Sequence, residues 1–569
     1  MPRASPLPYT SCLESEFRAT DKGTSFKKAI DKNMKLQIVL ISGAVTAGKS
    51  TVCKGLQRRF GVHVLKTKAI IQRTFPDAPS ERQELQRLGD RLDTKTKGLW
   101  VRDELIRYID AEGLGDSIVA VDAVRKPEQV DGVRRAYGPR VFHIHLTASD
   151  GELGRRYSHR KRSLDRELPS YSSVRAGSQT EERINRLQEI ADVVIATDRC
   201  SKEEVLIRVA SHLGLYGREQ EQVVDVVVGG QFGSEGKGHI CSYLAPEYDV
   251  LVRVGGPNAG HKVFQDPEPY THRQLPSGTL FSNAKLLIGP GAVINVDTLL
   301  KEVADCDVDS QRLSIDPQAM IITEADIEKE KGLKCAIGST GQGVGEASAR
   351  RILDRGRNEF TLAKFEPRLS LFCRPVADQL EEAFSKRRRI LLEGTQGTGL
   401  SIYHGVYPYV TSRDTTVAGC LSEAGISPIR VRRVVMVCRS YVIRVQSPKG
   451  GTSGPLKGRL SWKTISERSG IPLKELEGVE QGSVSHKQRR VGEFDWVQLK
   501  RASSLNAPTD IALTFADYIN AGNSEARRFE QLTEPTIRFA EEIEKVAAAP
   551  VSLISTRFHW KSIIDRRAW

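Results

Sequence analysis

The hydrophobic positions of the chain form short apolar runs that end in glycine, and two of these runs begin separate patterns of strands and helices. Residues 36–42 read Leu-Gln-Ile-Val-Leu-Ile-Ser before Gly43, and residues 223–228 read Val-Val-Asp-Val-Val-Val before Gly229. Runs rich in Val, Ile and Leu are typical of buried parallel strands, which helices cover on both faces. The pattern therefore predicts an α/β protein with two domains, each built on a mostly parallel central sheet with flanking helices.

Further elements are predicted between the two runs. Strands are expected at 117–121, 140–146 and 192–196, and a helix at 202–213, with a basic helical stretch before the last strand. The stretch 215–222 is polar and contains glycine, as linkers commonly do. We predict a loose N-terminal tail over 1–34, a first domain over 35–216, a linker over 217–222 and a second domain over 223–569.

Composition and charge narrow the class of protein. The 569 residues include 39% hydrophobic and 27% charged side chains, and the formal net charge of +14 favours polyanionic partners such as nucleotides. No apolar run approaches the roughly 20 residues that span a bilayer, and residues 1–35 contain no hydrophobic signal core. The nine cysteines show neither a C-x-x-C pair nor zinc spacing. We therefore expect a cytoplasmic protein with reduced thiols and no membrane partner. Motifs for nucleic-acid binding are absent from the sequence.

The first domain begins with a phosphate-binding motif. Its residues Gly43-Ala-Val-Thr-Ala-Gly48-Lys49-Ser50-Thr51 fit G-x-x-x-x-G-K-[ST], between a predicted strand and a predicted helix. The glycines let backbone amides curl around a phosphate, Lys49 reaches the β- and γ-phosphates, and the Ser50 hydroxyl ligates Mg²⁺. The sequence therefore predicts an ATP site that uses Mg²⁺.

Two further features of this domain suit phosphoryl transfer. Asp122 ends a strand, where it would orient Mg²⁺, and Arg125 follows three residues later to hold an acceptor phosphate. The stretch 154–162 is rich in arginine, including Arg156 and Arg160, which suits a lid over transferring phosphates; the alternative is a solvated basic helix face. The domain resembles the nucleoside and nucleotide monophosphate kinase families, but the resemblance does not identify the acceptor.

The second domain carries an ordered series of glycine-rich motifs. The first, Gly230-Gln-Phe-Gly233-Ser234-Glu-Gly236-Lys237-Gly238, exposes amides to an anion at a helix N-terminus. The later motifs are Arg253-Val-Gly-Gly256-Pro-Asn258-Ala-Gly260-His261, Leu275-Pro-Ser-Gly278, Gly338-Ser-Thr340-Gly-Gln-Gly343, Glu393-Gly-Thr-Gln396-Gly-Thr398 and Tyr407-Pro-Tyr-Val-Thr411. With these motifs in this order, residues 223–569 resemble the adenylosuccinate synthetase family.

That resemblance implies a homodimeric ligase that joins aspartate to C6 of inosine monophosphate (IMP). The reaction consumes GTP and requires Mg²⁺. The family phosphorylates the purine O6, and the aspartate amine then displaces phosphate. By resemblance, Lys237 grips the γ-phosphate, His261 acts as acid or hydrogen-bond donor, Gln396 holds the O6 region and the Gly260 carbonyl ligates Mg²⁺. The residues expected to bind the nucleotide 5′-phosphate are Asn258, Thr340, Thr411 and, from a neighbouring subunit, Arg350.

The first departure from the family lies in the glycine-rich loop after the first strand. The family's Gly-Asp-Glu-Gly-Lys-Gly reads Gly-Ser-Glu-Gly-Lys-Gly here, so Ser234 replaces the carboxylate that serves as base at N1 and as Mg²⁺ ligand. Either the site is catalytically silent, or the smaller residue leaves room for the 2-amino group of guanine. The second interpretation resembles the viral branch that makes 2-aminoadenylosuccinate from deoxyguanylate, and we favour it.

The donor and aspartate sites depart as well. The family's Thr-Lys-x-Asp reads Thr514-Phe515-Ala-Asp517, and its Ser-Thr-Gly-Pro begins at Ser555. Phe515 would stack on adenine and Asp517 would accept from a base amine, so ATP or dATP is at least as plausible a donor as GTP. The aspartate loop retains polar and basic residues, namely Ser485, Lys487 and Arg489.

The sequence therefore favours a bifunctional nucleotide enzyme: a ligase for guanine-type monophosphates, with dGMP preferred, fused to an ATP-dependent kinase-like domain. Its expected partners are a purine monophosphate, aspartate and a nucleoside triphosphate. The alternatives are a synthetase acting on IMP and a catalytically silent nucleotide-sensing protein.

Overall fold

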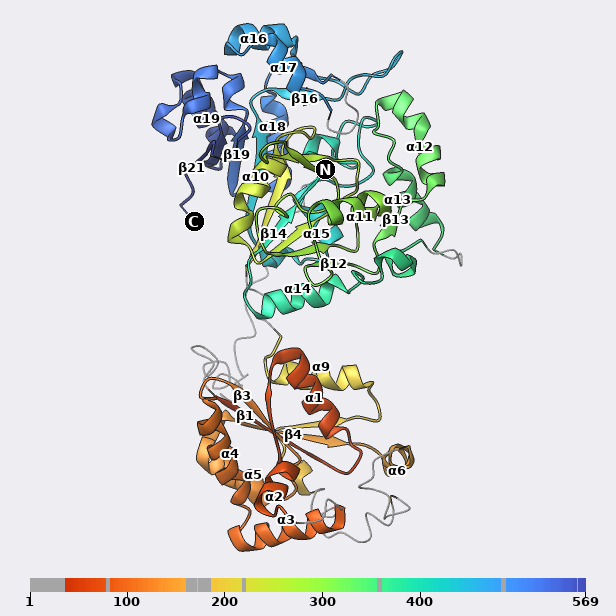
Figure 1. Ribbon diagram of the computed structural model, residues 1–569, viewed down its shortest axis with the longest axis vertical. Helices are drawn as coiled ribbons and strands as arrows, with labels where there is room; N and C mark the ends of the chain where they lie inside the picture. The colour runs from red at the N-terminus through yellow and green to blue at the C-terminus, as the bar shows by residue number, and fades with distance from the viewer. Residues whose placement is uncertain are drawn as a thin grey trace, which may run out of the picture. The chain divides into compact units, whose positions relative to one another are not determined.

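The computed structural model describes residues 36–77, 82–159, 171, 186–216, 222–355, 361–482, 488–559 and 561–568. The chain divides into two compact units, the first ending at Leu215 and the second starting at Tyr216. Both units are α/β folds with parallel central sheets, as predicted (Figure 1). The predicted tail over 1–34 and most of the predicted linker lie outside the described residues. Among the described helices, none is long and apolar enough to cross a membrane.

The first unit is built on a five-stranded parallel sheet in the order β2-β3-β1-β4-β5. The strands are β1 (Gln37–Gly43), β2 (His63–Lys66), β3 (Ile118–Asp122), β4 (Val141–Thr147) and β5 (Val193–Ala196). The apolar run of β1 lies in the middle of the sheet, and residues 38–41 are fully buried. The predicted strands match β3, β4 and β5 with a shift of about one residue, whereas the short, half-polar β2 was not predicted.

Helices cover both faces of this sheet (Figure 1). Ile38 and Leu40 share a core with α4 (Trp100–Glu112) and α5 (Pro127–Tyr137), while α1 (Lys49–Phe60) and α9 (Lys202–His212) lie on the other face. The other α-helices in the described part of this unit are α2 (Thr67–Thr74), α3 (Arg82–Thr96) and α6 (Asp150–Ser158). The prediction of a helix at 202–213 is confirmed by α9, which begins with a capping box at Ser201.

The second unit is built on a nine-stranded sheet in the order β12-β10-β7-β14-β6-β15-β19-β20-β21. All its strand pairs are parallel except β20 with β21. In that order the strands are β12 (Leu313–Ile315), β10 (Lys285–Ile288), β7 (Val250–Arg253), β14 (Ile390–Glu393), β6 (Val224–Gly229), β15 (Val431–Arg439), β19 (Asp510–Thr514), β20 (Val551–Ser555) and β21 (Ile563–Asp565). Three smaller sheets pair β8 (His261–Val263) with β9 (Tyr270–His272), β11 (Val293–Ile294) with β13 (Met320–Ile321), and β18 (Arg490–Gly492) with β16 (Val442–Arg444) and β17 (Arg459–Leu460).

Alternate residues of the central strand β6 point into two hydrophobic cores. Val226 and Val228 pack with α14 (Val376–Ser385), α15 (Val417–Ala424), α18 (Trp496–Asn506) and α19 (Glu534–Ala547), whereas Val227 packs with α10 (Lys237–Leu244) and α11 (Val296–Asp305). This period of two places helices on both faces of the sheet. The remaining helices are α12 (Glu324–Ile337), α13 (Val344–Leu353), α16 (Trp462–Ser469) and α17 (Leu473–Val479).

Candidate active sites

The parallel strands of the second unit end at one edge of the sheet, and most of the predicted site residues follow those ends. Lys237 follows β6, His261 follows β7, Gln396 follows β14, Phe515 follows β19, and Ser555 is the last residue of β20. Ligands of open α/β sheets bind outside the carboxyl ends of the strands. Motifs that are up to 318 residues apart in the sequence therefore meet in one region of the fold.

The loop after β6 folds around a buried carboxylate. Gly233 and Ser234 both have positive φ, 85° and 57°, so the chain turns sharply before α10. Glu235 is fully buried, and its Oε1 accepts hydrogen bonds from the backbone amides of Gln231 (3.1 Å) and Gly233 (2.8 Å). Its Oε2 lies 2.6 Å from Nζ of Lys237. The carboxylate thus fixes both the loop and the lysine that is predicted to bind phosphate.

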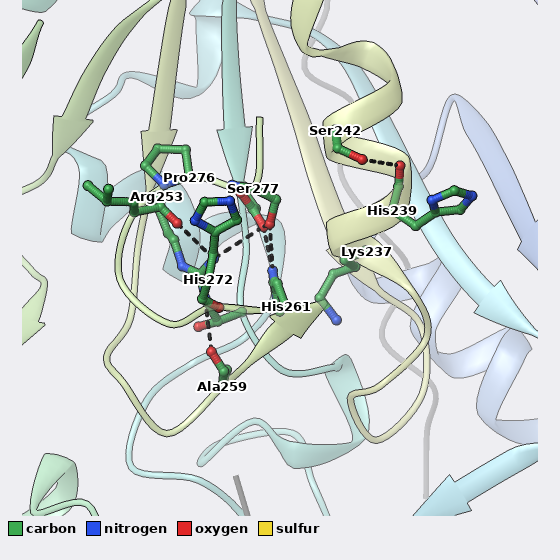
Figure 2. Close-up of polar contacts among 12 residues, drawn as sticks. Lys237, His239, Ser242, Arg253, Ala259, His261, His272, Pro276 and Ser277 are labelled. Carbon is green, nitrogen blue, oxygen red and sulfur yellow. Dashed lines mark hydrogen bonds and ion pairs between the residues drawn. The ribbon is translucent and has the colours of Figure 1, made fainter. Parts of the chain in front are cut away.

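His261 lies against the first turn of α10. A Cβ on Gly238 would come within 2.8 Å of the His261 Cβ, so this contact requires glycine at 238. Nδ1 of His261 is hydrogen bonded to Glu393 and lies 3.4 Å from the hydroxyl of Ser277, and Figure 2 shows this group beside Lys237. Arg253 lies 3.5 Å from the same carboxylate. His261 is therefore held by a buried acid whose own position is fixed by an arginine and a serine.

The charges of this group follow from burial and pairing. Burial, with the nearby Arg253, lowers the pKa of His261 to about 4, so the imidazole is neutral near pH 7. Burial alone would raise the pKa of Glu393, but Arg253 and His261 outweigh it and hold that pKa at about 2. Because an ionised carboxylate only accepts, Nδ1 of His261 carries the proton and Nε2 is an acceptor. A phosphoryl anion beside Nε2 would raise this pKa and turn the ring into a donor.

Three of the residues predicted to bind the acceptor nucleotide are connected by hydrogen bonds. Gln396 has a φ of 59°, and its Nε2 donates to Oδ1 of Asn258 at 2.9 Å. Nδ2 of Asn258 donates to the hydroxyl of Thr411 at 3.5 Å. The Gln396 Oε1 accepts from Thr395 at 3.0 Å, which fixes the orientation of the amide. Purine-binding and phosphate-binding candidates from separate motifs therefore adjoin each other.

The other two acceptor candidates lie in the loop after α12 and on α13, and the start of α13 adjoins the Thr411 motif, because a Cβ on Gly345 would lie 3.5 Å from the Cβ of Ser412. Thr340 is in the loop after α12, where its carbonyl accepts from Gln342 at 3.4 Å. Arg350 on α13 forms a bidentate pair with Asp326, with N–O distances of 3.0 and 2.7 Å. Arg350 would have to leave this partner to reach a neighbouring subunit, so its predicted role stays a prediction.

The donor-base candidates lie at the ends of the adjacent strands β19 and β20. Phe515 has a φ of 58°, and its carbonyl accepts from the Ser440 hydroxyl at 2.6 Å. The hydroxyl of Ser555 donates to the carbonyl of Arg557 at 3.1 Å. Oδ1 of Asp517 is buried and has no hydrogen-bond partner in the described part of the chain, and burial raises the pKa of Asp517 to about 7. With this pKa, about half of the Asp517 carboxyl groups are protonated near pH 7. Oδ1 is available to a ligand.

The predicted aspartate site is described only at its end, because Ser485 and Lys487 lie outside the described residues. Arg489 is described, and its Nη1 lies 3.0 Å from Glu480. Glu480 also binds Arg439, the last residue of β15. Neither Glu480 nor Arg439 was predicted from the sequence, although the position of Arg439 at a strand end was a usable signal.

In the first unit, the phosphate-binding loop has the geometry that its motif predicts. Gly48 has a φ of 102° and precedes α1, and a Cβ on Gly43 would lie 2.2 Å from the carbonyl oxygen of Leu146. Nζ of Lys49 donates to the carbonyls of Gly43 (2.7 Å) and Ala44 (2.8 Å). The lysine thus lies over the loop that would hold the phosphates.

Two predicted magnesium-site residues of this unit are in contact. The hydroxyl of Ser50 donates to Oδ2 of Asp122 at 2.9 Å, across 72 residues of sequence. The other oxygen, Oδ1, is buried without a hydrogen-bond partner among the described residues. A hydroxyl and a carboxylate with a spare oxygen are the ligands that Mg²⁺ accepts beside phosphates, so the residues fit this ion.

The lid candidates are placed only in part. Arg156 on α6 is paired with Glu152 at 2.7 Å and donates to the hydroxyl and carbonyl of Thr197, each at 2.9 Å. It therefore joins α6 to the end of β5. The backbone amide of Arg125 donates to Gln129 at 2.8 Å, and Arg160 lies outside the described residues.

Comparison with known proteins identifies the family of the second unit. The family model for adenylosuccinate synthetase matches residues 226–364 and 353–523. The adenylosuccinate synthetase of Thermococcus onnurineus is 36% identical over 351 residues, which cover 60% of this chain and 98% of that protein. The chain belongs to the adenylosuccinate synthetase family, as its motifs predicted.

Solved structures agree on the fold. Fully ligated adenylosuccinate synthetase from Plasmodium falciparum is similar with a TM-score of 0.52 and 24% identity, over 61% of this chain and all of that chain. The succinoaminodeoxyadenylate synthetase of cyanophage S-2L, bound to dGMP and to dATP as an energy donor, is similar with a TM-score of 0.51 and 26% identity. That match covers 61% of this chain and 96% of the cyanophage chain.

Proposed function

We propose that the second unit joins aspartate to C6 of a guanine-type purine monophosphate, with dGMP preferred, through a 6-phosphoryl intermediate. Family membership supports a ligase of the adenylosuccinate synthetase type. The observation that carries the proposal is the meeting of Lys237, His261 and Gln396 at one sheet edge, beside Ser234 in place of the family's aspartate. Such a fixed arrangement of charges and donors stabilises the charge that develops during phosphoryl transfer.

The reaction proceeds in two displacements. The purine O6 attacks the γ-phosphorus of the donor, the bond to the β-phosphate oxygen breaks, the N1 proton is lost and a nucleoside diphosphate leaves. The aspartate amine then attacks C6, a C–N bond forms, and the C–O bond breaks to release phosphate. Lys237 would hold the γ-phosphate, His261 would donate to it once protonated, and Gln396 would hold O6. Mg²⁺ would neutralise phosphate charge, with the Gly260 carbonyl as a ligand from the chain.

The choice of guanine rests on Ser234. A serine hydroxyl is smaller than a carboxylate and carries no charge, so it leaves room and a hydrogen-bond partner for the 2-amino group that hypoxanthine lacks. The similar cyanophage enzyme holds dGMP, which supports the same acceptor here. The proton at N1 then needs another acceptor than residue 234, and we assign this role to Nε2 of His261, which is neutral near pH 7.

Adenine is the donor base that the site favours. The family lysine is replaced by Phe515, an aromatic ring able to stack on a purine, and Asp517 supplies a carboxyl oxygen without a partner. A neutral carboxyl group matches adenine, because its carbonyl accepts from N6 and its hydroxyl donates to N1. An ionised carboxylate matches guanine instead, because it accepts from both N1 and N2. The cyanophage enzyme with dATP as its energy donor supports an adenine nucleotide.

A substrate panel tests both choices. The full-length protein is incubated with aspartate, Mg²⁺, one of dGMP, GMP or IMP, and one of ATP, dATP or GTP, while phosphate release is measured. We expect release that requires aspartate, is fastest with dGMP, and is faster with ATP or dATP than with GTP. Preference for IMP over dGMP would refute the guanine acceptor. Absence of aspartate-dependent release from every combination would refute the ligase and favour the nucleotide-sensing alternative.

For the first unit we propose ATP-dependent phosphoryl transfer to a monophosphate or another small phosphorylated acceptor. The contact between Ser50 and Asp122, beside the loop that bears Lys49, supports it. ADP formation is measured without aspartate across a monophosphate panel, in Lys49→Ala and in the matched variant Lys237→Ala of the other unit. We expect turnover to be lost in Lys49→Ala and retained in Lys237→Ala. Tight ATP binding without turnover of any acceptor would favour regulation by ATP.

A further inference from the structure

Glu480 lies at the centre of a buried group of charged residues, the Glu480 cluster, which consists of Arg439, Glu480, Arg489 and Tyr518. Glu480 and Arg439 are both fully buried. Oε1 of Glu480 accepts from Nη2 of Arg439 at 2.7 Å and from the Tyr518 hydroxyl at 2.8 Å, and Oε2 lies 3.0 Å from Nη1 of Arg489. Burial acts to raise the pKa of Glu480, but the two arginines outweigh it and hold that pKa at about 2. Glu480 is therefore ionised, and its carboxylate is paired with both Arg439 and Arg489.

Arg439 extends the cluster to the catalytic loop. Its Nη1 donates to the carbonyl of Ser234 at 3.3 Å, and its backbone exchanges two hydrogen bonds with the Gln231 side chain, at 3.2 and 3.0 Å. The guanidinium also lies 3.9 Å from the centre of the Phe515 ring. One arginine thus contacts both the loop beside the acceptor purine and the ring assigned to the donor base.

Arg489 extends the cluster in the other direction, to the aspartate loop. Its backbone amide donates to the carbonyl of Glu480 at 3.1 Å, and its own carbonyl accepts from the indole of Trp462 at 2.9 Å. The segment that carries the predicted aspartate-binding residues Ser485 and Lys487 runs between Glu480 and Arg489 in the sequence. A side-chain and a backbone hydrogen bond between Glu480 and Arg489 therefore connect the two residues on either side of this segment.

We propose that Glu480 is a positioning residue that couples Arg489, a predicted aspartate-binding residue, to the loop bearing Ser234 and to Phe515. This inference rests on the proposed ligase function. The carboxylate acts through the two arginines, whose guanidinium groups both bind it directly. Removing one member of a buried ion pair leaves the partners with uncompensated charge, so both arginines are expected to shift when Glu480 is neutralised.

The chain contains a matched control for this cluster. Asp225, at the start of β6, is also fully buried and also accepts from a tyrosine and an arginine, namely Tyr248 and Arg432. Because β6 runs from Asp225 to the glycine loop, this second cluster lies at the opposite edge of the sheet from the proposed site. Glu480→Gln and Tyr518→Phe can therefore be compared with Asp225→Asn and Tyr248→Phe, which remove the same groups far from the site.

Steady-state kinetics and hydrogen exchange of the full-length protein test the coupling. In Glu480→Gln the KM for aspartate should rise at least tenfold, because Arg489 depends on this carboxylate. The KM for the acceptor should change by threefold or less, because Gln231 still holds the Ser234 loop. Tyr518→Phe, which keeps every charge, should raise the KM for aspartate about threefold. Asp225→Asn and Tyr248→Phe should lower the melting temperature and leave both KM values unchanged.

Two kinetic outcomes would overturn the inference: an unchanged KM for aspartate in Glu480→Gln, or an equal rise in Asp225→Asn. Amide exchange in peptides covering 229–238 gives a readout that needs no activity. It should accelerate in Glu480→Gln, which does not touch that loop directly, and stay unchanged in Asp225→Asn. If the wild-type protein released no phosphate with aspartate, the proposed function would fail. The exchange result would still decide the coupling, since unchanged exchange at 229–238 would refute it.

Discussion

The pH dependence of donor choice is a direct consequence of the environment of Asp517. Burial raises the pKa of this carboxyl group to about 7, and its Oδ1 has no hydrogen-bond partner among the described residues. The neutral form, which dominates below pH 7, matches the hydrogen-bond pattern of adenine, and the ionised form, which dominates above it, matches that of guanine. The ratio of kcat/KM for ATP to kcat/KM for GTP should therefore fall as the pH rises.

The size of the effect follows from the titration. With a pKa of about 7, the ratio of neutral to ionised carboxyl is about 10 at pH 6 and about 0.1 at pH 8, so the ATP-to-GTP preference should fall by up to about 100-fold. If the neutral form also binds guanine and the ionised form also binds adenine, each with one hydrogen bond fewer, the change in preference falls to about tenfold. A lost hydrogen bond to a base is worth only about 1 kcal/mol.

The assay measures aspartate-dependent phosphate release with each donor at pH 6, 7 and 8, in a Lys49→Ala background that removes consumption of ATP by the first unit. Asp517→Asn is the control, because an amide presents one donor and one acceptor, like the neutral acid, and does not ionise. It should prefer ATP at every pH. A wild-type ratio that stays constant from pH 6 to 8, or an equal slope in Asp517→Asn, would refute the reasoning.

Three further predictions concern acceptor choice, catalysis and stability. Ser234→Asp should shift the ratio of kcat/KM from dGMP toward IMP, because a carboxylate crowds the 2-amino group; an unchanged ratio would remove Ser234 from acceptor selection. His261→Ala should lower kcat about 100-fold with little change in substrate affinity, as loss of a general acid does. His239→Ala is its control, since His239 projects from α10 away from His261 (Figure 2), and equal losses in the two variants would argue against a specific role. Asp517→Asn should also gain thermal stability over the wild type as the pH rises from about 4 to 7, because the wild-type carboxylate, ionised in the unfolded chain, must take up a proton when the chain folds; calorimetry showing a constant difference would contradict this.

The sequence predicted those parts of the fold and site that depend on local pattern. The apolar runs before Gly43 and Gly229 became the central strands β1 and β6, because a short run rich in β-branched and other aliphatic residues has few other stable positions than a buried parallel strand. The family motifs also predicted that Gln396 and Asn258 belong to one site, and the structure places them 2.9 Å apart. In both cases the information lies within a few consecutive residues.

The residues that were missed depend on contacts between distant segments. Glu480 and Arg439 are 41 residues apart, and nothing around Glu480 distinguishes it from the other acidic residues of its helical segment. Its importance arises only when the fold buries it against two arginines. Glu393 was quoted as part of a motif but received no role, because its function is to hold His261, 132 residues away. Pairing of buried charges is decided by tertiary packing, which spacing along the chain does not encode.

Three groups at the proposed site of the second unit are each held by a buried carboxylate: Lys237 by Glu235, His261 by Glu393, and Arg439 by Glu480. Hydrogen bonds to these carboxylates hold the three groups in a fixed arrangement. A phosphate that binds Lys237 must therefore compete with Glu235, which lies 2.6 Å away. The backbone amides of Gln231 and Gly233 continue to hold Glu235 when the lysine turns toward phosphate. The loop can thus exchange one anion for another without losing its shape, which is what a site that binds a triphosphate and releases a diphosphate requires.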